Sequence, residues 1–232
     1  MSGSIENTGV VLVHGAWADG SSWNDVIAPL LSRGLNVVAA PLPLTSLADD
    51  IDALDRALER IDGPAVLVAH AYAGAVIAGS TNARVQSLVF VAALAPDEGE
   101  TVADMFYREL PHPQAPQLAP DAHGLIWMPK AGFGSAFAQH APPARTAALA
   151  AVQRPISVAC IQQKAPRPGW RSKPSWYLIA EQDRMISPVT QLFMAKRMGA
   201  HIRSENLDHT PMVTAPERVT DIILEAVSSP AR

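Results

Sequence analysis

The 232-residue sequence lacks several features that mark particular classes of protein. Its single cysteine, Cys160, cannot form an internal disulfide. No apolar run reaches the roughly 18 residues that a membrane-spanning helix needs. The first residues, MSGSIENTGV, have neither the basic start nor the apolar run of a signal peptide. These absences predict a cytoplasmic protein without a membrane partner.

The charge and the motif content argue against further classes. The formal net charge is -4, so the sequence has no basic excess for a nucleic-acid partner. It has no G-x-x-x-x-G-K-[ST] loop, no HExxH and no paired CxxC, and GFGS at 132–135 is too short for a dinucleotide loop. We therefore expect no metal and no other cofactor.

Apolar runs alternate with helical patterns along most of the chain, as in a parallel sheet covered on both faces. The predicted strands are 8–16, 35–43, 65–71, 85–96, 175–183 and 201–207. The predicted helices are 21–34, 46–63, 72–81, 187–199 and 215–227. This order predicts an α/β fold, with a mostly parallel central sheet and helices on both faces.

The alternation breaks in the middle of the chain. Prolines crowd the stretch LPHPQAPQLAPDAHGLIWMP, and SAFAQHAPPARTAALAAVQRP has the pattern of short helical pieces. The pattern of strands resumes at 175. We expect a single domain over residues 1–232 with a helical lid inserted at about 99–173.

The stretch VAHAYAGAVI at 68–77 has the form of a strand, a turn of small residues and a helix. Enzymes that present a nucleophilic serine on such a turn have the pattern G-x-S-x-G there. In this sequence the five positions run from Ala69 to Ala73, and Ala71 occupies the place of the serine. The motif is therefore predicted from its context, because its three defining residues are absent.

Two later residues fit the acid and the base of a catalytic triad. Asp183 follows a predicted strand, at the edge of the sheet where α/β proteins place functional groups. His209, in LDHTPM, lies between the last strand and the last helix. A lone aspartate or histidine is usually a cap, surface or core residue, but together they complete the chain order nucleophile, acid, base. We predict His209 as base and Asp183 as its orienter.

The loop HGAW after the first strand is predicted to supply part of an oxyanion hole, with the backbone N–H groups of Ala16 and Tyr72 as donors. His14 is expected to hold this loop by hydrogen bonding. His70 precedes Ala71 on a strand, so strand alternation predicts that it points to the opposite side, and it is not predicted as the base.

These motifs together resemble the α/β-hydrolase superfamily, and in particular its small esterase branch of methyl-ester esterases and hydroxynitrile lyases. The resemblance rests on VLVHGAWADGSSW, VAHAYAGAVI, KPSWYLIAEQDRMI and DHTPM, and it covers the core more closely than the lid. It implies ester hydrolysis. Relatives usually have GHSxGG or GHSxAG at the turn, so Ala71 removes the residue on which that reaction depends.

The aromatic and apolar residues of the loops and lid predict a small, largely apolar ester-type substrate. The candidate substrate-binding residues are Trp17, Phe106, Trp127, Phe133, Phe137 and Met212, together with Tyr72. Each of the lid aromatics has packing of the lid as an alternative role. The sequence leaves the oligomeric state open, with a homodimer among the options.

Three interpretations of Ala71 remain open. The leading one is that alanine replaces a parental serine, so that substrate binds but is not turned over, because loss of a triad serine removes turnover far more than binding. The second is a cofactor-free lyase or dioxygenase that uses the His209 and Asp183 dyad for proton abstraction. The third is a ligand-binding pseudoenzyme with a natural alanine.

Overall fold

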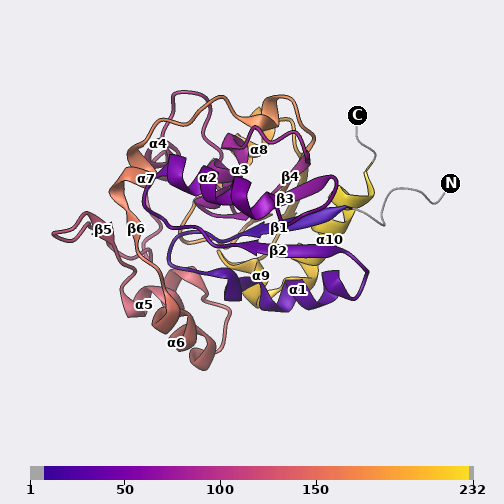
Figure 1. Cartoon of the computed structure of the whole chain (residues 1–232). Coiled ribbons are helices and arrows are strands. Elements are labelled where there is room, and N and C mark those ends of the chain that lie inside the picture. The colour runs from indigo at the N-terminus through magenta and orange to yellow at the C-terminus, as the bar shows by residue number, and fades with distance from the viewer. Residues whose placement is uncertain (1–7, 230–232) are drawn as a thin grey trace.

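A six-stranded, wholly parallel sheet forms the centre of the computed structural model, which describes residues 8–229 (Figure 1). Its strand order is β2-β1-β3-β4-β7-β8. The strands are β1 (Gly9–Val13), β2 (Asn36–Ala40), β3 (Ala65–His70), β4 (Val85–Val91), β7 (Ser175–Ala180) and β8 (His201–Glu205). Every residue of β1, β3 and β7 is buried, which explains their continuous apolar runs.

Helices cover both faces of this sheet and define two separate apolar cores. The face covered by α1 and α10 carries one core, and the face covered by α2, α3 and α8 carries the other. The bounds are α1 (Asn24–Leu31), α2 (Leu47–Leu58), α3 (Ala73–Gly79), α8 (Pro188–Arg197), α9 (Pro211–Thr214) and α10 (Pro216–Ser228). The predicted fold class is therefore confirmed.

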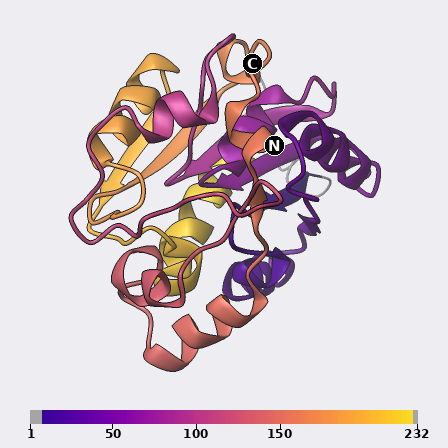
Figure 2. The same ribbon diagram turned by 90° about the vertical axis from the view of Figure 1, so that its left-hand side faces the viewer.

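The chain between β4 and β7 forms short elements beside the sheet, seen from their own side in Figure 2. The helices here are α4 (Val102–Phe106), α5 (Lys130–Gly132), α6 (Pro143–Val152) and α7 (Val158–Gln162), with a π-helical turn at Phe133–Phe137 and a 3-10 turn at Gly169–Arg171. The two antiparallel strands β5 (Leu125–Ile126) and β6 (Ile156–Ser157) were not predicted. Two-residue strands are too short to leave a periodic pattern.

Hydrogen bonds tie this segment to the loops at the carboxyl ends of the strands. The Trp17 indole donates to the carbonyl of Ile126 at 2.9 Å, and the Trp17 backbone N–H donates to the carbonyl of Arg154 at 3.0 Å. On another loop, the N–H of Ser157 donates to the carbonyl of Leu44 at 3.0 Å. The segment between β4 and β7 therefore covers the end of the sheet at which Ala71 lies.

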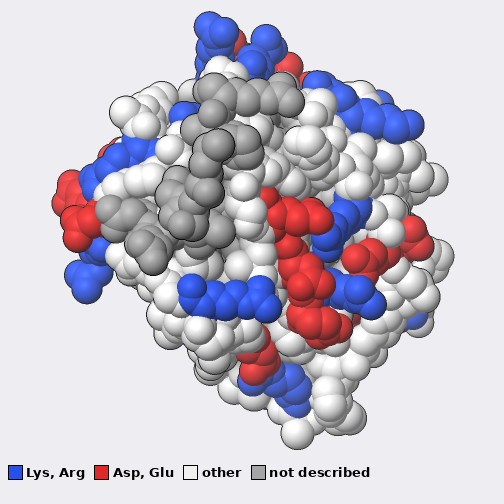
Figure 3. Space-filling view, turned by 90° about the vertical axis from the view of Figure 1, so that its right-hand side faces the viewer, with Lys and Arg blue, Asp and Glu red and all other residues white. Residues whose placement is uncertain are grey.

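The side of the molecule away from this segment carries basic and acidic side chains in mixture (Figure 3). No helix within residues 8–229 is long and apolar enough to cross a membrane. The prediction that the chain lacks a signal peptide was based on residues 1–10. Of these, residues 1–7 lie outside the described residues.

Candidate functional site

Ala71 occupies a sharp turn between β3 and α3. Its φ of 50° lies in the left-handed region, which costs an L-residue about 1–2 kcal/mol. Its carbonyl accepts from the N–H of Gly74 at 3.1 Å and of Leu94 at 2.9 Å. A Cβ on Gly74 would lie 2.3 Å from the carbonyl oxygen of Leu94, so the turn excludes larger residues at position 74. The backbone has the strand, sharp turn and helix that present a nucleophile in other enzymes, and here the side chain at the turn is a methyl group.

His209 and Asp183 form a buried, hydrogen-bonded pair. The His209 Nδ1 atom lies 2.8 Å from Asp183 Oδ2. The carboxylate also accepts from the backbone N–H groups of Met185 at 2.7 Å and Ile186 at 2.9 Å, and from Gln191 Nε2 at 2.7 Å. These contacts fix the carboxylate, which in turn holds the proton on Nδ1. The Nε2 atom of His209 is then the free basic nitrogen.

His70 supports His209 from behind. Its Nε2–H donates to the carbonyl of His209 at 2.8 Å, and the two ring centroids lie 4.7 Å apart. Burial, followed by the proximity of His209, lowers the pKa of His70 well below its ordinary value. His70 is thus a neutral donor that holds the backbone of His209. It does not line the cavity described below, and its contact with His209 was not predictable, because tertiary packing alone brings the two residues together.

The backbone N–H groups of Ala16 and Tyr72 have no hydrogen-bond acceptor in the described part of the chain. Both residues are buried, with 5% and 3% of their surfaces exposed, and both line one cavity with Ala71. A Cβ on Gly15 would lie 3.0 Å from that of Ala71, so the loop before Ala16 packs directly against the turn. Buried N–H groups are rarely left unpaired, and these two can serve a ligand oxygen.

His14 holds this loop in place. Its Nδ1 lies 2.9 Å from the carbonyl oxygen of Gly15, and its Nε2 accepts from the N–H of Leu42 at 3.3 Å. Burial lowers the pKa of His14, so the ring is neutral and can donate through one nitrogen and accept through the other. The role is structural, as the sequence predicts.

A second buried network joins the turn to the lid through Asp50. Tyr72 donates its hydroxyl to Asp50 Oδ2 at 2.6 Å, the N–H of Leu44 donates to Oδ1 at 2.7 Å, and Cys160 Sγ lies 3.7 Å from Oδ2. Burial raises the pKa of Asp50, and it raises the pKa of Cys160 to about 12. Cys160 is therefore a thiol at neutral pH and not a nucleophile. No sequence pattern predicts this network, because its four members come together only in the folded chain.

An apolar cavity of about 50 Å³ lies at the turn. Ala71, His209, Ala16, Tyr72, Trp17 and Phe106 are among the residues that line it. Its apolar lining also includes residues that the sequence analysis missed, namely Leu94, Val102, Ile126, Ile156, Ile161 and Ile186. Leu94 and Ile186 follow strands β4 and β7, and the other four lie on α4, α7, β5 and β6.

Trp127 and Met212 do not line this cavity, unlike Trp17 and Phe106. Trp127 is 47% exposed and its indole lies 3.3 Å from Asp121 Oδ2. Met212 is fully buried in the core beneath α1 and α10. The start of α9 turns the Met212 side chain into the core on that face of the sheet.

Phe133 and Phe137 are also buried, and they do not line the cavity. Phe137 packs between the site residues, with ring centroids 6.4 Å from Trp17 and 5.3 Å from His209. Phe133 packs against Phe137 at 5.2 Å. Their role is to support the walls of the cavity.

The described residues hold no group of three or more His, Cys, Asp or Glu side chains that could bind a metal ion. The functional groups gathered at the cavity are instead an oriented imidazole, two free N–H groups and an apolar wall. This set suits chemistry at a carbonyl group.

A family profile identifies the class of protein. The profile described as "Alpha/beta hydrolase family" matches residues 10–222, so the chain belongs to the alpha/beta hydrolase family. No curated protein sequence matches the chain.

Solved structures share the whole fold at low sequence identity. A pyrethroid hydrolase from Sphingobium faniae JZ-2 is 22% identical, with a TM-score of 0.81 over 97% of this chain and 98% of that one. Polyneuridine aldehyde esterase is 18% identical, with a TM-score of 0.76 over 94% and 98% of the two chains. An extracellular alpha/beta-hydrolase from a Paenibacillus species is 19% identical, with a TM-score of 0.78 over 96% and 99%. These similarities extend over nearly all of the chain and establish its fold.

Proposed function

We propose that this fold performs ester hydrolysis through a Ser-His-Asp triad when residue 71 is serine, and that the chain with Ala71 binds such an ester without hydrolysing it. The observation that carries the proposal is the left-handed φ of Ala71, on a turn that shares a cavity with His209, which Asp183 orients. The apolar lining supports a small, largely apolar substrate.

In the parental reaction, the serine Oγ forms a bond to the ester carbonyl carbon while its proton passes to His209 Nε2. The electron pair displaced from the carbonyl rests on its oxygen, which accepts from the N–H groups of Ala16 and Tyr72. Collapse of this intermediate breaks the bond to the alcohol oxygen, which takes the proton from His209. Water then repeats the two steps and releases the acid.

The replacement of a parental serine explains why the other parts of the machinery persist. Alanine gains nothing from the left-handed conformation, which glycine adopts without the steric cost. The pair of His209 and Asp183, and the free N–H groups, likewise have no packing task that would preserve them together. The natural gene tests this directly, because an alanine codon at position 71 would contradict the replacement of a serine.

A hydrolysis assay tests the catalytic part of the proposal. The Ala71→Ser variant is expected to hydrolyse a short-chain nitrophenyl ester, while the Ala71 chain binds that ester and remains inactive. Adding His209→Ala to the Ala71→Ser variant should abolish turnover, because the serine then has no base. An inactive, folded Ala71→Ser variant would contradict the proposal.

One observation favours a second candidate, a cofactor-free enzyme that uses His209 and Asp183 alone. The dyad is complete in the present chain, with four donors around the Asp183 carboxylate, and it needs no hydroxyl to take a proton from a bound substrate. In that case the Ala71 chain is itself active on substrates with an acidic C–H bond. His209→Ala would abolish this activity, and Ala71→Ser would change it little.

The third candidate, a pseudoenzyme receptor, requires only the cavity. It differs from the other two in its response to His209→Ala and Ala71→Ser, because neither substitution would create or remove turnover. A natural alanine codon, with inactivity of both forms, would favour this candidate.

A further inference from the structure

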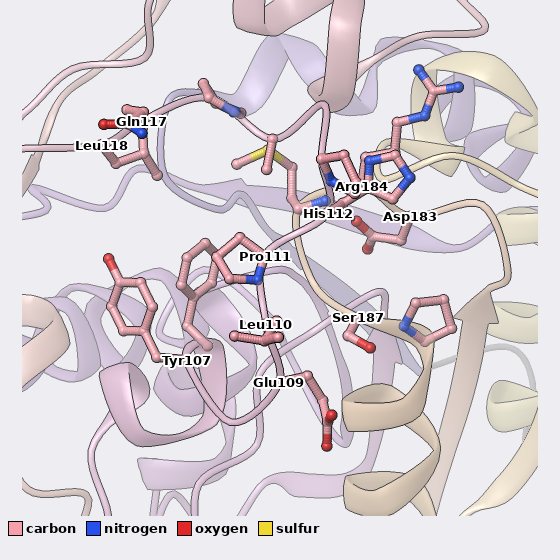
Figure 4. Close-up of a pocket in the computed structure, with 16 residues that line it drawn as sticks. Tyr107, Glu109, Leu110, Pro111, His112, Gln117, Leu118, Asp183, Arg184 and Ser187 are labelled. Atoms are coloured by element: carbon pink, nitrogen blue, oxygen red, sulfur yellow. Dashed lines mark hydrogen bonds between the residues drawn. The ribbon is translucent and has the colours of Figure 1, made fainter.

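Two cavities meet at the site, and they differ in size and chemistry. The inner cavity at Ala71 measures about 50 Å³, whereas an outer pocket measures about 450 Å³ and is shown in Figure 4. Phe106, Tyr107, Leu118 and Met185 line both of them. These four side chains, which we call the partition, therefore form the wall between the two spaces.

The inner cavity limits the group that lies closest to the carbonyl carbon. A cavity of about 150 Å³ holds the six carbons of benzene, so 50 Å³ accommodates roughly two heavy atoms. The potential oxyanion donors Ala16 and Tyr72 line only this inner cavity. The carbonyl of a bound ester must lie there, and the acyl chain beyond it can be little longer than acetyl.

The outer pocket offers a different surface. Its wall includes residues of the exposed loop from Tyr107 to Pro113 and, on the other side, residues 183–185, 187 and 188. Tyr107 and the loop prolines provide flat apolar surface, while the charges of Glu109 and Arg184 have opposite signs. The Arg184 guanidinium is already tied to the carbonyl of Ser135 at 2.7 Å. The pocket therefore suits a large, uncharged group better than an anion or a cation.

The path of the proton in the proposed reaction indicates which space would hold the acyl group of the ester and which would hold its alcohol. His209 must return its proton to the leaving oxygen, so the alcohol lies on the side of the His209 and Asp183 pair. The outer pocket is built on that side, because Asp183 begins its wall and the backbone N–H of Met185 is bonded to the Asp183 carboxylate at 2.7 Å. The alcohol would reach the pocket past Phe106 and Met185.

We infer that the site is selective for short acyl esters, of about acetyl size, of larger uncharged alcohols, and that the partition separates the acyl space from the alcohol space. This inference rests on the proposed function. Met185 is held by its backbone, but its side chain is unbranched and can shift as the alcohol passes. Phe106 ends the short helix α4, which is fixed by a capping box between Thr101 and Asp104, and is the more rigid part of the partition.

The test compares kcat/KM of the Ala71→Ser variant for 4-nitrophenyl acetate, butyrate and hexanoate, which share one leaving group. Each added pair of methylenes should lower kcat/KM about tenfold or more, because the inner cavity has no room for them. A second pair of substrates, benzyl acetate and ethyl acetate, varies only the alcohol, and benzyl acetate should be preferred.

Phe106→Ala in the Ala71→Ser variant should join the two spaces and reduce the ratio of acetate to hexanoate activity at least tenfold. Leu192→Ala is the control, because it removes a partly exposed apolar side chain of α8 that lines neither space and should leave the ratio unchanged. Hydrolysis with hexanoate equal to or better than acetate, or equal ratios in the Phe106→Ala and Leu192→Ala variants, would overturn the inference alone. A folded Ala71→Ser variant that hydrolyses none of these esters would refute the proposed function, and the inference with it.

Discussion

Replacing Asp50 with alanine should destabilise the protein strongly, although Asp50 lies outside the proposed triad. Its fully buried carboxylate accepts from the Tyr72 hydroxyl at 2.6 Å and from the Leu44 N–H at 2.7 Å. It is also 3.7 Å from the thiol of Cys160 on α7. One side chain thus links the turn at Ala71, the loop after β2 and the lid.

The loss of stability comes from the hydrogen-bond donors that the substitution leaves without an acceptor. A buried donor that loses its acceptor costs about 1–3 kcal/mol, and Asp50→Ala leaves both the Tyr72 hydroxyl and the Leu44 N–H in that state. The free energy of unfolding should fall by about 4 kcal/mol in total. For a chain of this length each kcal/mol lowers Tm by about 2–4 °C, so Tm should fall by about 8–16 °C.

Thermal unfolding followed by circular dichroism measures this effect, with Asp52→Ala as the matched control. Asp52 lies on the same helix but is exposed, so its removal should leave Tm nearly unchanged. Equal Tm values for Asp50→Ala and Asp52→Ala would refute the reasoning.

The pH dependence of Asp50→Asn provides an independent check on the same residue. Burial raises the pKa of Asp50 above its ordinary value of 3.8. A raised folded pKa means that the stabilising contribution is complete below the unfolded pKa and is lost as pH rises through the folded pKa. The stability advantage of Asp50 over asparagine should therefore be greatest near pH 4 and smaller at pH 8. An advantage that grows with pH would contradict the raised pKa.

Three further predictions concern the turn and the dyad. Gly74→Ala should cost about 2–3 kcal/mol, because its Cβ would lie 2.3 Å from a carbonyl oxygen, whereas Gly134→Ala, with nothing within 4 Å, should cost far less in the same urea unfolding experiment. Burial lowers the pKa of His70, so the stability that the neutral ring contributes is present above pH 6.5 and is lost as pH falls through the folded pKa. His70→Gln should remove this loss of stability at acid pH in unfolding curves measured from pH 8 to 4. An unchanged pH dependence in the variant would count against this reasoning. Asp183→Asn in the Ala71→Ser variant should lower kcat by about 10⁴-fold, because asparagine no longer holds the required imidazole tautomer, and a loss under tenfold in steady-state assays would exclude that role.

The fold was largely predictable because burial of both sheet faces leaves a strong mark in the sequence. The apolar run in β3 and the amphipathic pattern of α10 gave these elements within one or two residues at most ends. The start of α2 also agrees with the predicted range 46–63, because Ser46 caps this helix by accepting from the N–H of Asp49 at 3.1 Å. The segment between β4 and β7 was less predictable, because its strands are two residues long and its pairing joins residues 32 positions apart, Leu125 and Ser157.

The residues of the candidate triad were predictable from their order along the chain, whereas the residues that form the cavity walls depend on tertiary packing. Asp183 and His209 stand at strand ends, and strand order in a parallel sheet brings such ends together. The walls of the cavity follow no such rule. Trp127 was aromatic and in the lid but is exposed, whereas Ile156 and Met185 had no distinguishing pattern and line the cavity. Whether such a residue lines the cavity depends on how the segment between β4 and β7 packs on the core.

The central claim is that residue 71 is the nucleophile position of a serine hydrolase. Its most direct test is the intact mass of the Ala71 chain and of the Ala71→Ser variant after exposure to a fluorophosphonate probe. The account predicts one added probe mass, on residue 71 of the Ala71→Ser variant only, and no adduct on the Ala71 chain. A folded Ala71→Ser variant that remains unlabelled, or an adduct of equal yield on the Ala71 chain, would contradict it.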